Sequence, residues 1–118
     1  MSAKVSTSAQ SKALAKDLGE RPEGGWQAAH IVPSNNFTNR SAAVQRAIKK
    51  AQKKMDKYLK GKRNTHINGF WGLPGHAGTH TNKFFLELGE AFANVGSSAQ
   101  ARGALRSMWN KIKKGTYG

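Results

Sequence analysis

The sequence predicts an α+β fold that is mostly helical and contains a small β-β-α core. Apolar residues recur at steps of three and four in several long stretches, which is the period of an amphipathic helix. Two shorter stretches, each ended by a proline, hold the β-branched and aromatic residues typical of strands. A chain of 118 residues can bury one core but hardly a second. We therefore expect one main domain.

The first half of the chain is expected to contain a helix, a strand and a second helix. Residues 1–25 form a lead-in with a short helix over Ser6–Leu18 and a linker. The main domain covers 26–118 and begins with a strand over Trp26–Val32. An amphipathic helix follows over 41–60. Its apolar face is formed by Val44, Ile48, Ala51, Met55 and Leu59.

The second half is expected to complete the core and add a final helix. The β-β-α core spans 26–33 and 67–95, with its second strand over Ile67–Leu73 and its helix over Thr81–Val95. The last helix is expected over 97–113, because its first position pairs a serine with a glutamine three residues later. That pairing is a capping-box pattern, which marks the start of a helix.

The charge balance points to a polyanionic partner. Twenty Lys and Arg face six Asp and Glu, which gives a formal charge of +14 and a pI near 10.6. Nucleic acid is the commonest partner of such a domain, with an anionic membrane or an acidic protein as the other candidates. The absence of cysteine excludes disulfides and thiolate metal sites. No apolar run approaches the roughly 18 residues of a spanning helix, so no membrane is expected.

The helix over 41–60 carries charge of almost one sign on its outer face. A solvated charged face is the ordinary interpretation of such a stripe. Here the like charges repel one another unless a polyanion lies beside them, so we predict contact with phosphates and no reading of bases. The expected nucleic-acid-binding residues are Arg46, Lys49, Lys50, Lys53, Lys54 and Lys57.

All four histidines lie in or beside the two strands and the turn after the second. His76 and His80 are four residues apart, a spacing that puts both rings on one side of a helical turn and suits one divalent ion. His30 ends the first strand, and Asn68 lies early in the second. Each of them alone is an ordinary surface, capping or half-buried residue. In this order they predict a β-β-α metal module.

These motifs resemble those of the AHH group of the HNH/endonuclease VII (His-Me finger) superfamily, found as C-terminal toxin domains of bacterial polymorphic toxins. The hallmark of that family is Ala-His-His-Ile-Val-Pro, then Asn-Gly followed by Leu-Pro, then a His-x3-His segment. This chain has Ala28-Ala29-His30-Ile31-Val32-Pro33, then Asn68-Gly69 followed by Leu73-Pro74, then His76 and His80. The resemblance runs from about Leu14 to Phe92 and implies a metal-dependent endonuclease.

The resemblance also implies a role for each residue of the site. His76 and His80 correspond to the metal ligands, His30 to the base that takes a proton from the attacking water, and Asn68 to the partner that orients His30 by a hydrogen bond. Ala29 stands where the family pattern has a further histidine that binds the metal. Either Ala29 is a disabling substitution, which we favour, or it is natural and water completes a weaker site. In both cases the chain should bind metal less tightly and cut poorly.

The expected cofactor is one divalent ion: imidazole ligands favour Zn²⁺, Ni²⁺ or Mn²⁺, while a water-rich site accepts Mg²⁺. His66 shares strand parity with Asn68 and is a further candidate for the cleft. The resemblance implies an antibacterial DNase, secreted or delivered as the C-terminal part of a larger toxin. It would act in the target-cell cytoplasm and be neutralised by an immunity protein, which we expect to be acidic. Two alternatives stay open: an RNase of the same fold, and a non-catalytic nucleic-acid-binding module with a structural metal.

Overall fold

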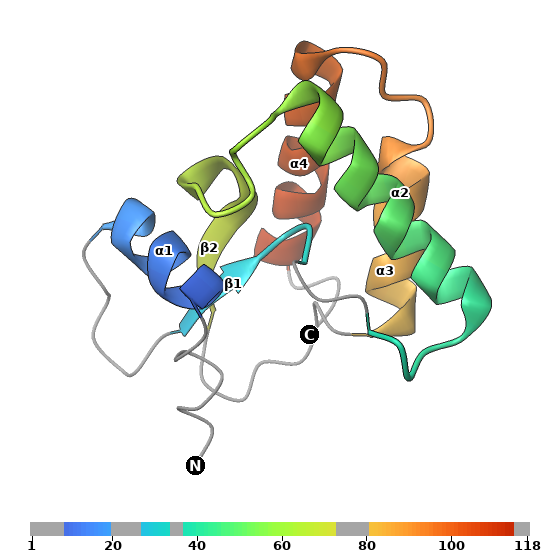
Figure 1. The fold of residues 1–118 in the computed structure, drawn as a ribbon, viewed down its shortest axis with the longest axis horizontal. Helices are drawn as coiled ribbons and strands as arrows, with labels where there is room; N and C mark the ends of the chain where they lie inside the picture. Colours follow the sequence, from blue (N-terminus) through green and yellow to red (C-terminus); the bar gives the residue numbers. More distant parts are fainter. Residues whose placement is uncertain (1–8, 20–26, 34–36, 73–80, 115–118) are drawn as a thin grey trace.

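A computed structural model describes residues 9–19, 27–33, 37–72 and 81–114 of the chain (Figure 1). These residues form a small, mostly helical α+β fold, as the sequence predicts. No helix in this part of the chain is both long and apolar enough to cross a bilayer. In chain order the elements are α1 (Ala9–Leu18), β1 (Gln27–His30), α2 (Ala42–Tyr58), the 3₁₀-helix η2 (His66–Asn68), β2 (Gly69–Gly72), α3 (Asn82–Phe92) and α4 (Ser98–Lys113).

The two strands pair antiparallel, with Gln27 opposite Gly72 and His30 opposite Gly69. A two-stranded sheet has only marginal stability in water on its own, so it needs other elements to pack against. In Figure 1 the strands lie between α1 and the group formed by α2, α3 and α4. Leu14 of α1 is fully buried, and a Cβ at Gly69 would overlap its side chain. The glycine therefore lets α1 pack closely on the sheet.

The hydrophobic core lies mainly among α2, α3 and α4. The apolar face predicted for the second helix is confirmed, since all five of its members are buried. Phe84, Phe85 and Leu88 of α3 are fully buried beside it. The two helices approach closely because Gly89 faces Ala47, where an added Cβ would lie 2.6 Å from the Ala47 Cβ. The strands pack on this core through Phe70 of β2, which is buried in the same cluster.

Side-chain caps fix where three helices begin. The hydroxyl of Ser41 accepts from the backbone N–H three residues on, and Thr81 does the same for α3. Ser97 accepts from the Gln100 N–H at 3.1 Å, which confirms the predicted start of α4. The Gln100 amide oxygen accepts from the Gly96 N–H at 2.6 Å, so both side chains occupy unpaired N–H groups at this end.

The predicted second strand, Ile67–Leu73, is wrong at its start. His66–Asn68 form η2, and β2 begins only at Gly69. The Asn68 N–H donates to the Thr65 carbonyl at 3.0 Å, which closes the turn and keeps this N–H out of the sheet ladder. Leu73 lies outside the described residues.

The predicted first strand, Trp26–Val32, is too long at its C-terminal end. β1 ends at His30, because the backbone of Val32 bonds to the side chain of Asn68 and does not continue the ladder. Trp26 lies outside the described residues. The helix predicted over Thr81–Val95 is observed as α3, which ends at Phe92.

Candidate active site

His30 is the last residue of β1 and is half-buried. Its Nε2 lies 2.8 Å from the Oδ1 of Asn64, in the turn that precedes η2. An amide oxygen can only accept a hydrogen bond, so Nε2 carries the proton of the neutral ring. The lone pair of a neutral His30 is then on Nδ1, which is the atom able to take a proton.

The surroundings of His30 favour its neutral form. Burial lowers the pKa of His30 below its ordinary value of 6.5, because the charged ring loses hydration. The hydrogen bond to Asn64 raises the pKa, and the positive charge of Arg63 lowers it. The net shift is downward, so the ring is neutral and proton-accepting at neutral pH.

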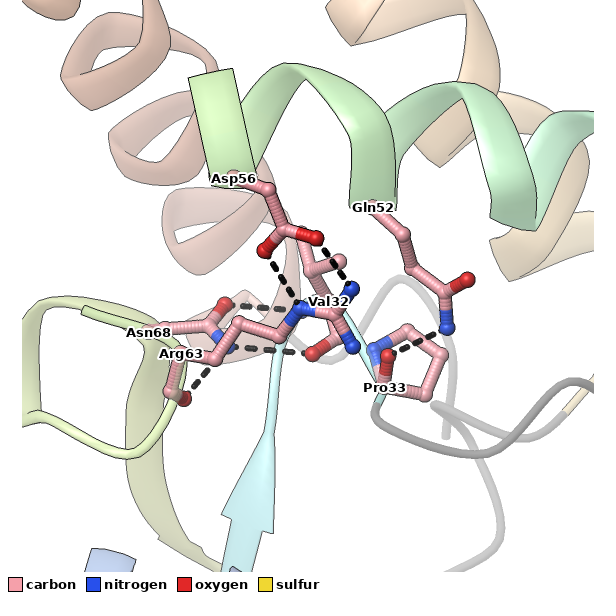
Figure 2. Close-up of polar contacts among 6 residues, drawn as sticks. All are labelled: Val32, Pro33, Gln52, Asp56, Arg63 and Asn68. Carbon is pink, nitrogen blue, oxygen red and sulfur yellow. Dashed lines mark hydrogen bonds and ion pairs between the residues drawn. The ribbon is translucent and has the colours of Figure 1, made fainter. Parts of the chain in front are cut away.

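Asn68 is fully buried and binds the backbone (Figure 2). Its Oδ1 accepts from the Val32 N–H at 2.8 Å, and its Nδ2 donates to the carbonyls of Val32 at 3.0 Å and Arg63 at 2.8 Å. The backbone carbonyl of Asn68 also accepts from the Ile31 N–H at 2.8 Å. These bonds tie the segment after β1 to the turn before β2, and so fix the end of the strand that carries His30.

The hydrogen bond predicted between Asn68 and the His30 ring is wrong. The side-chain amide of Asn68 makes its hydrogen bonds to the backbone of Val32 and Arg63. Asn64 is the residue that contacts the His30 ring. Sequence reasoning missed Asn64, because a single amide in a polar turn has no pattern that sets it apart. Its only signal is its position four residues before Asn68.

The C-terminal half of α2 holds the same region from the other side (Figure 2). Gln52 is buried and its Nε2 donates to the Pro33 carbonyl at 2.8 Å. Asp56 receives two hydrogen bonds from the Arg63 guanidinium, at 3.0 and 2.8 Å. Such fork-to-fork pairing fixes the orientation of both groups. Arg63 is therefore held in place near His30, where its charge acts on the ring.

His66 joins η2 to α1. Its backbone N–H and its Nδ1 both bond to the Oδ2 of Asp17, at 2.6 and 3.0 Å. The backbone hydrogen bond from His66 is the main cause of the lowered pKa of the Asp17 carboxyl. His66 is exposed and occupied in this contact, so its position supports a role in docking α1, and the predicted role in the cleft gains no support.

One family model matches the chain over residues 11–115, and it describes a nuclease family of the HNH/ENDO VII superfamily with conserved AHH. The chain belongs to this AHH nuclease family. Membership makes it a nuclease domain and hence a hydrolase. No curated protein and no solved structure matches the chain significantly.

Of the three positions expected to bind the metal in an AHH domain, the structure describes only position 29. Ala29 is half-buried in β1, opposite Phe70, and packs against the hydrophobic core. Its methyl group cannot bind a metal. The other predicted ligands, His76 and His80, lie outside the described residues, and the residues that are described contain no cluster of three or more potential ligands. The metal site therefore stays a prediction.

The basic face of α2 is present and largely free. Arg46, Lys49, Lys50 and Lys53 are exposed, and within the described part of the chain none of them has an acidic partner. Lys57 is exposed too, with its Nζ 5.3 Å from the centre of the Tyr58 ring. These five residues form what we call the α2 basic face.

Lys54 departs from the nucleic-acid-binding set predicted for α2. It is half-buried, and its ammonium group donates to the Val95 carbonyl at 2.5 Å. This contact ties α2 to the segment between α3 and α4. Lys54 is therefore occupied within the fold, and we leave it out of the α2 basic face.

Proposed function

We propose that this AHH domain is a metal-dependent endonuclease that hydrolyses DNA with little sequence preference. The observation that carries the proposal is the state of His30: half-buried, with a lowered pKa, its Nε2 bonded to Asn64 and its Nδ1 without a partner among the residues that the structure describes. A general base needs that protonation state and a fixed orientation. A base of this kind typically contributes about 10² to 10⁴ in rate.

The proposed reaction is the attack of water on the scissile phosphate. A new bond forms between the water oxygen and phosphorus, the water proton passes to Nδ1 of His30, and the bond to the leaving sugar oxygen breaks. The imidazolium that forms keeps its Nε2–H bond to the Asn64 oxygen, which stabilises the charged ring. Asn68 acts through the backbone, because it fixes the end of β1 and thereby the place of His30.

A divalent ion bound through His76 and His80 would supply charge stabilisation at the scissile phosphate and the leaving oxygen. Imidazole ligands favour Zn²⁺, Ni²⁺ or Mn²⁺, and Mg²⁺ suits a site completed by water. Ala29 contributes no ligand, so the chain as it stands would hold the ion weakly and cut slowly.

The proposed biological role is that of an antibacterial toxin domain. It would be delivered from a bacterium as the C-terminal part of a larger protein and would act on DNA in the cytoplasm of the target cell. The family membership and the formal charge of +14 support this role. The same charge favours an acidic immunity protein as the neutralising partner, because opposite charges speed association and select the partner.

The decisive experiment restores the missing imidazole. We expect Ala29→His to nick plasmid DNA at least about tenfold faster than the parent chain with one of Mg²⁺, Mn²⁺, Zn²⁺ or Ni²⁺, since changes around metal sites commonly act by about 10- to 100-fold. Ala28→His is the matched control, because it adds the same ring to β1 at a position where the family pattern has alanine. Ala29→His combined with His30→Ala should be inactive.

Three outcomes of this experiment count against parts of the proposal. Restored protein that is folded by circular dichroism and binds DNA, yet nicks it with none of the four ions, indicates a non-catalytic module. Cleavage of RNA alone indicates an RNase. Equal activity of Ala28→His and Ala29→His removes the argument for a ligand at position 29.

A second prediction concerns the α2 basic face. Replacing Lys49, Lys50 and Lys53 with Gln should weaken DNA binding and flatten its dependence on salt, by about 0.9 in log–log slope for each phosphate that the variant no longer neutralises. Lys54→Gln is the matched control: it removes the same kind of charge, but its ammonium group is bonded to Val95, so the slope should not change. An unchanged slope in the triple variant would mean that this face meets another partner.

A further inference from the structure

A pocket of about 220 Å³ is lined by residues of α4, of η2 and of the segment that follows β1. Ile31 forms part of its wall and directly follows His30 in the chain. Consecutive Cα atoms are about 3.8 Å apart, so the backbone at this wall directly continues that of the proposed base. Its lining consists of Ile31, Ile67, Arg102, Leu105, Arg106 and Trp109.

The pocket combines an apolar lining with two unneutralised positive charges. Arg102 and Arg106 are four residues apart on α4, which places them on the same side of the helix. Both are exposed, and no acidic partner of either occurs among the residues that the structure describes. A well-matched ligand therefore offers a flat apolar group together with negative charge.

Trp109 gives this pocket a firm wall. Its ring lies 5.2 Å from that of Phe70, centre to centre, and the Nζ of Lys113 lies 5.7 Å from its centre. Packing of this kind holds an aromatic ring in one orientation. The wall is thus formed before any ligand arrives, which reduces the entropy lost on binding.

A nucleotide has both of the required properties in one unit. The pocket volume exceeds the about 150 Å³ that accommodates a benzene ring in an apolar cavity. Guanidinium groups bind phosphate oxygens in pairs and also stack on bases. We propose that the pocket holds one unstacked base of the nucleic-acid substrate, while Arg102 and Arg106 hold the adjacent phosphates.

This inference rests on the proposed nuclease function and narrows its substrate class. In a perfect duplex the base must first be unpaired and unstacked, whereas a single strand or a mismatch offers it at little cost. The domain should therefore prefer nucleic acid with unpaired bases. The α2 basic face contributes affinity for both kinds of substrate, because it contacts phosphates alone.

The test compares binding of the full chain to a single-stranded DNA of about 12 nucleotides and to the duplex of the same length. The two affinities are measured by fluorescence anisotropy. Arg102→Gln with Arg106→Gln should weaken single-strand binding by about 5-fold or more, because the two phosphates come within reach only when the neighbouring base occupies the pocket, and one stacked base commonly contributes at least about 5-fold. Duplex binding should weaken clearly less. The single strand should also change the emission of Trp109, and this part of the signal should vanish in Trp109→Phe.

The matched control is Lys16→Gln with Lys83→Gln, which removes two charges from exposed positions on α1 and α3. It should weaken binding to both DNAs equally. The inference is overturned if the arginine variant behaves like this control, or if single strand and duplex change the tryptophan emission equally. If the single-strand preference holds while Ala29→His never nicks DNA, the nuclease proposal fails and the base pocket stands. If Ala29→His nicks DNA but no preference appears, only the pocket fails.

Discussion

Two asparagines four residues apart serve the end of β1 in different ways. Asn68 is fully buried, and its amide makes three hydrogen bonds, all to the backbone of Val32 and Arg63. Asn64 is half-buried, and its oxygen accepts from the ring of His30. A buried amide must find a partner for each polar atom, and the backbone supplies those partners here. Asn64 is only half-buried, and its amide oxygen is available to accept a hydrogen bond from the proposed base.

The largest effect is expected at the buried member of the pair. Asn68→Ala leaves one N–H and two carbonyls without their partner, and each unsatisfied group costs about 1 to 3 kcal/mol when water is excluded. Since some of this cost is relieved by relaxation, we expect the free energy of unfolding to fall by about 3 kcal/mol. Urea denaturation at neutral pH measures it. Asn68→Asp should be at least as damaging, because its carboxylate would face two carbonyl oxygens. A loss below about 1 kcal/mol in Asn68→Ala would show that the clamp does not hold the end of β1.

The next effect separates activity from stability at Asn64. In the Ala29→His background, Asn64→Ala should reduce nicking by about 10- to 100-fold, the usual effect of removing a partner that orients a site residue. Its free energy of unfolding should change by no more than about 1 kcal/mol, because the variant lacks one half-buried hydrogen bond. Asn64→Asp serves as the control, since a carboxylate still accepts from Nε2 and should retain more activity. Full activity in Asn64→Ala would end the assignment of Asn64 as a positioning residue.

The smallest effect is a displacement of the pH profile. The acid limb of kcat/KM should lie below 6.5, because burial lowers the pKa of His30 and only the neutral ring accepts a proton. Arg63→Gln should move this limb to higher pH, and Asn64→Ala should move it to lower pH, since Arg63 lowers the pKa of His30 and the Asn64 bond raises it. Limbs that move in the same direction in both variants would contradict this account of His30.

The same shift has a consequence for stability. In the unfolded chain His30 takes up a proton near its ordinary pKa of 6.5, whereas the folded chain resists protonation until a lower pH. The folded state therefore has its full stability from His30 above pH 6.5. This stability is lost as the pH falls from 6.5 towards the pKa of His30 in the folded chain. Urea unfolding of His30→Gln beside the parent chain isolates this contribution, because the variant should lack this part of the pH dependence.

Lys53 and Lys54 of α2 differ in a similar way: one lies at the surface, and the other makes a hydrogen bond within the fold. The sequence predicts both as members of one basic stripe, yet Lys53 is exposed while Lys54 is bonded to the carbonyl of Val95. The helical period fixes which residues share a face, and the sequence contains that period. It does not contain the carbonyl 41 residues away that occupies one of the two ammonium groups.

The sequence by itself determined the helices, the serine cap of α4, the basic face and the position of His30 at a strand end. These features depend on neighbours within four residues, so local pattern is sufficient to predict them. Only the tertiary structure decided which amide meets His30, since Asn64 is 34 residues away from it. It also decided that His66 binds Asp17 and that two arginines of α4 border a pocket beside Ile31. Such contacts join segments distant in the chain, and their partners are set by how the helices and strands pack.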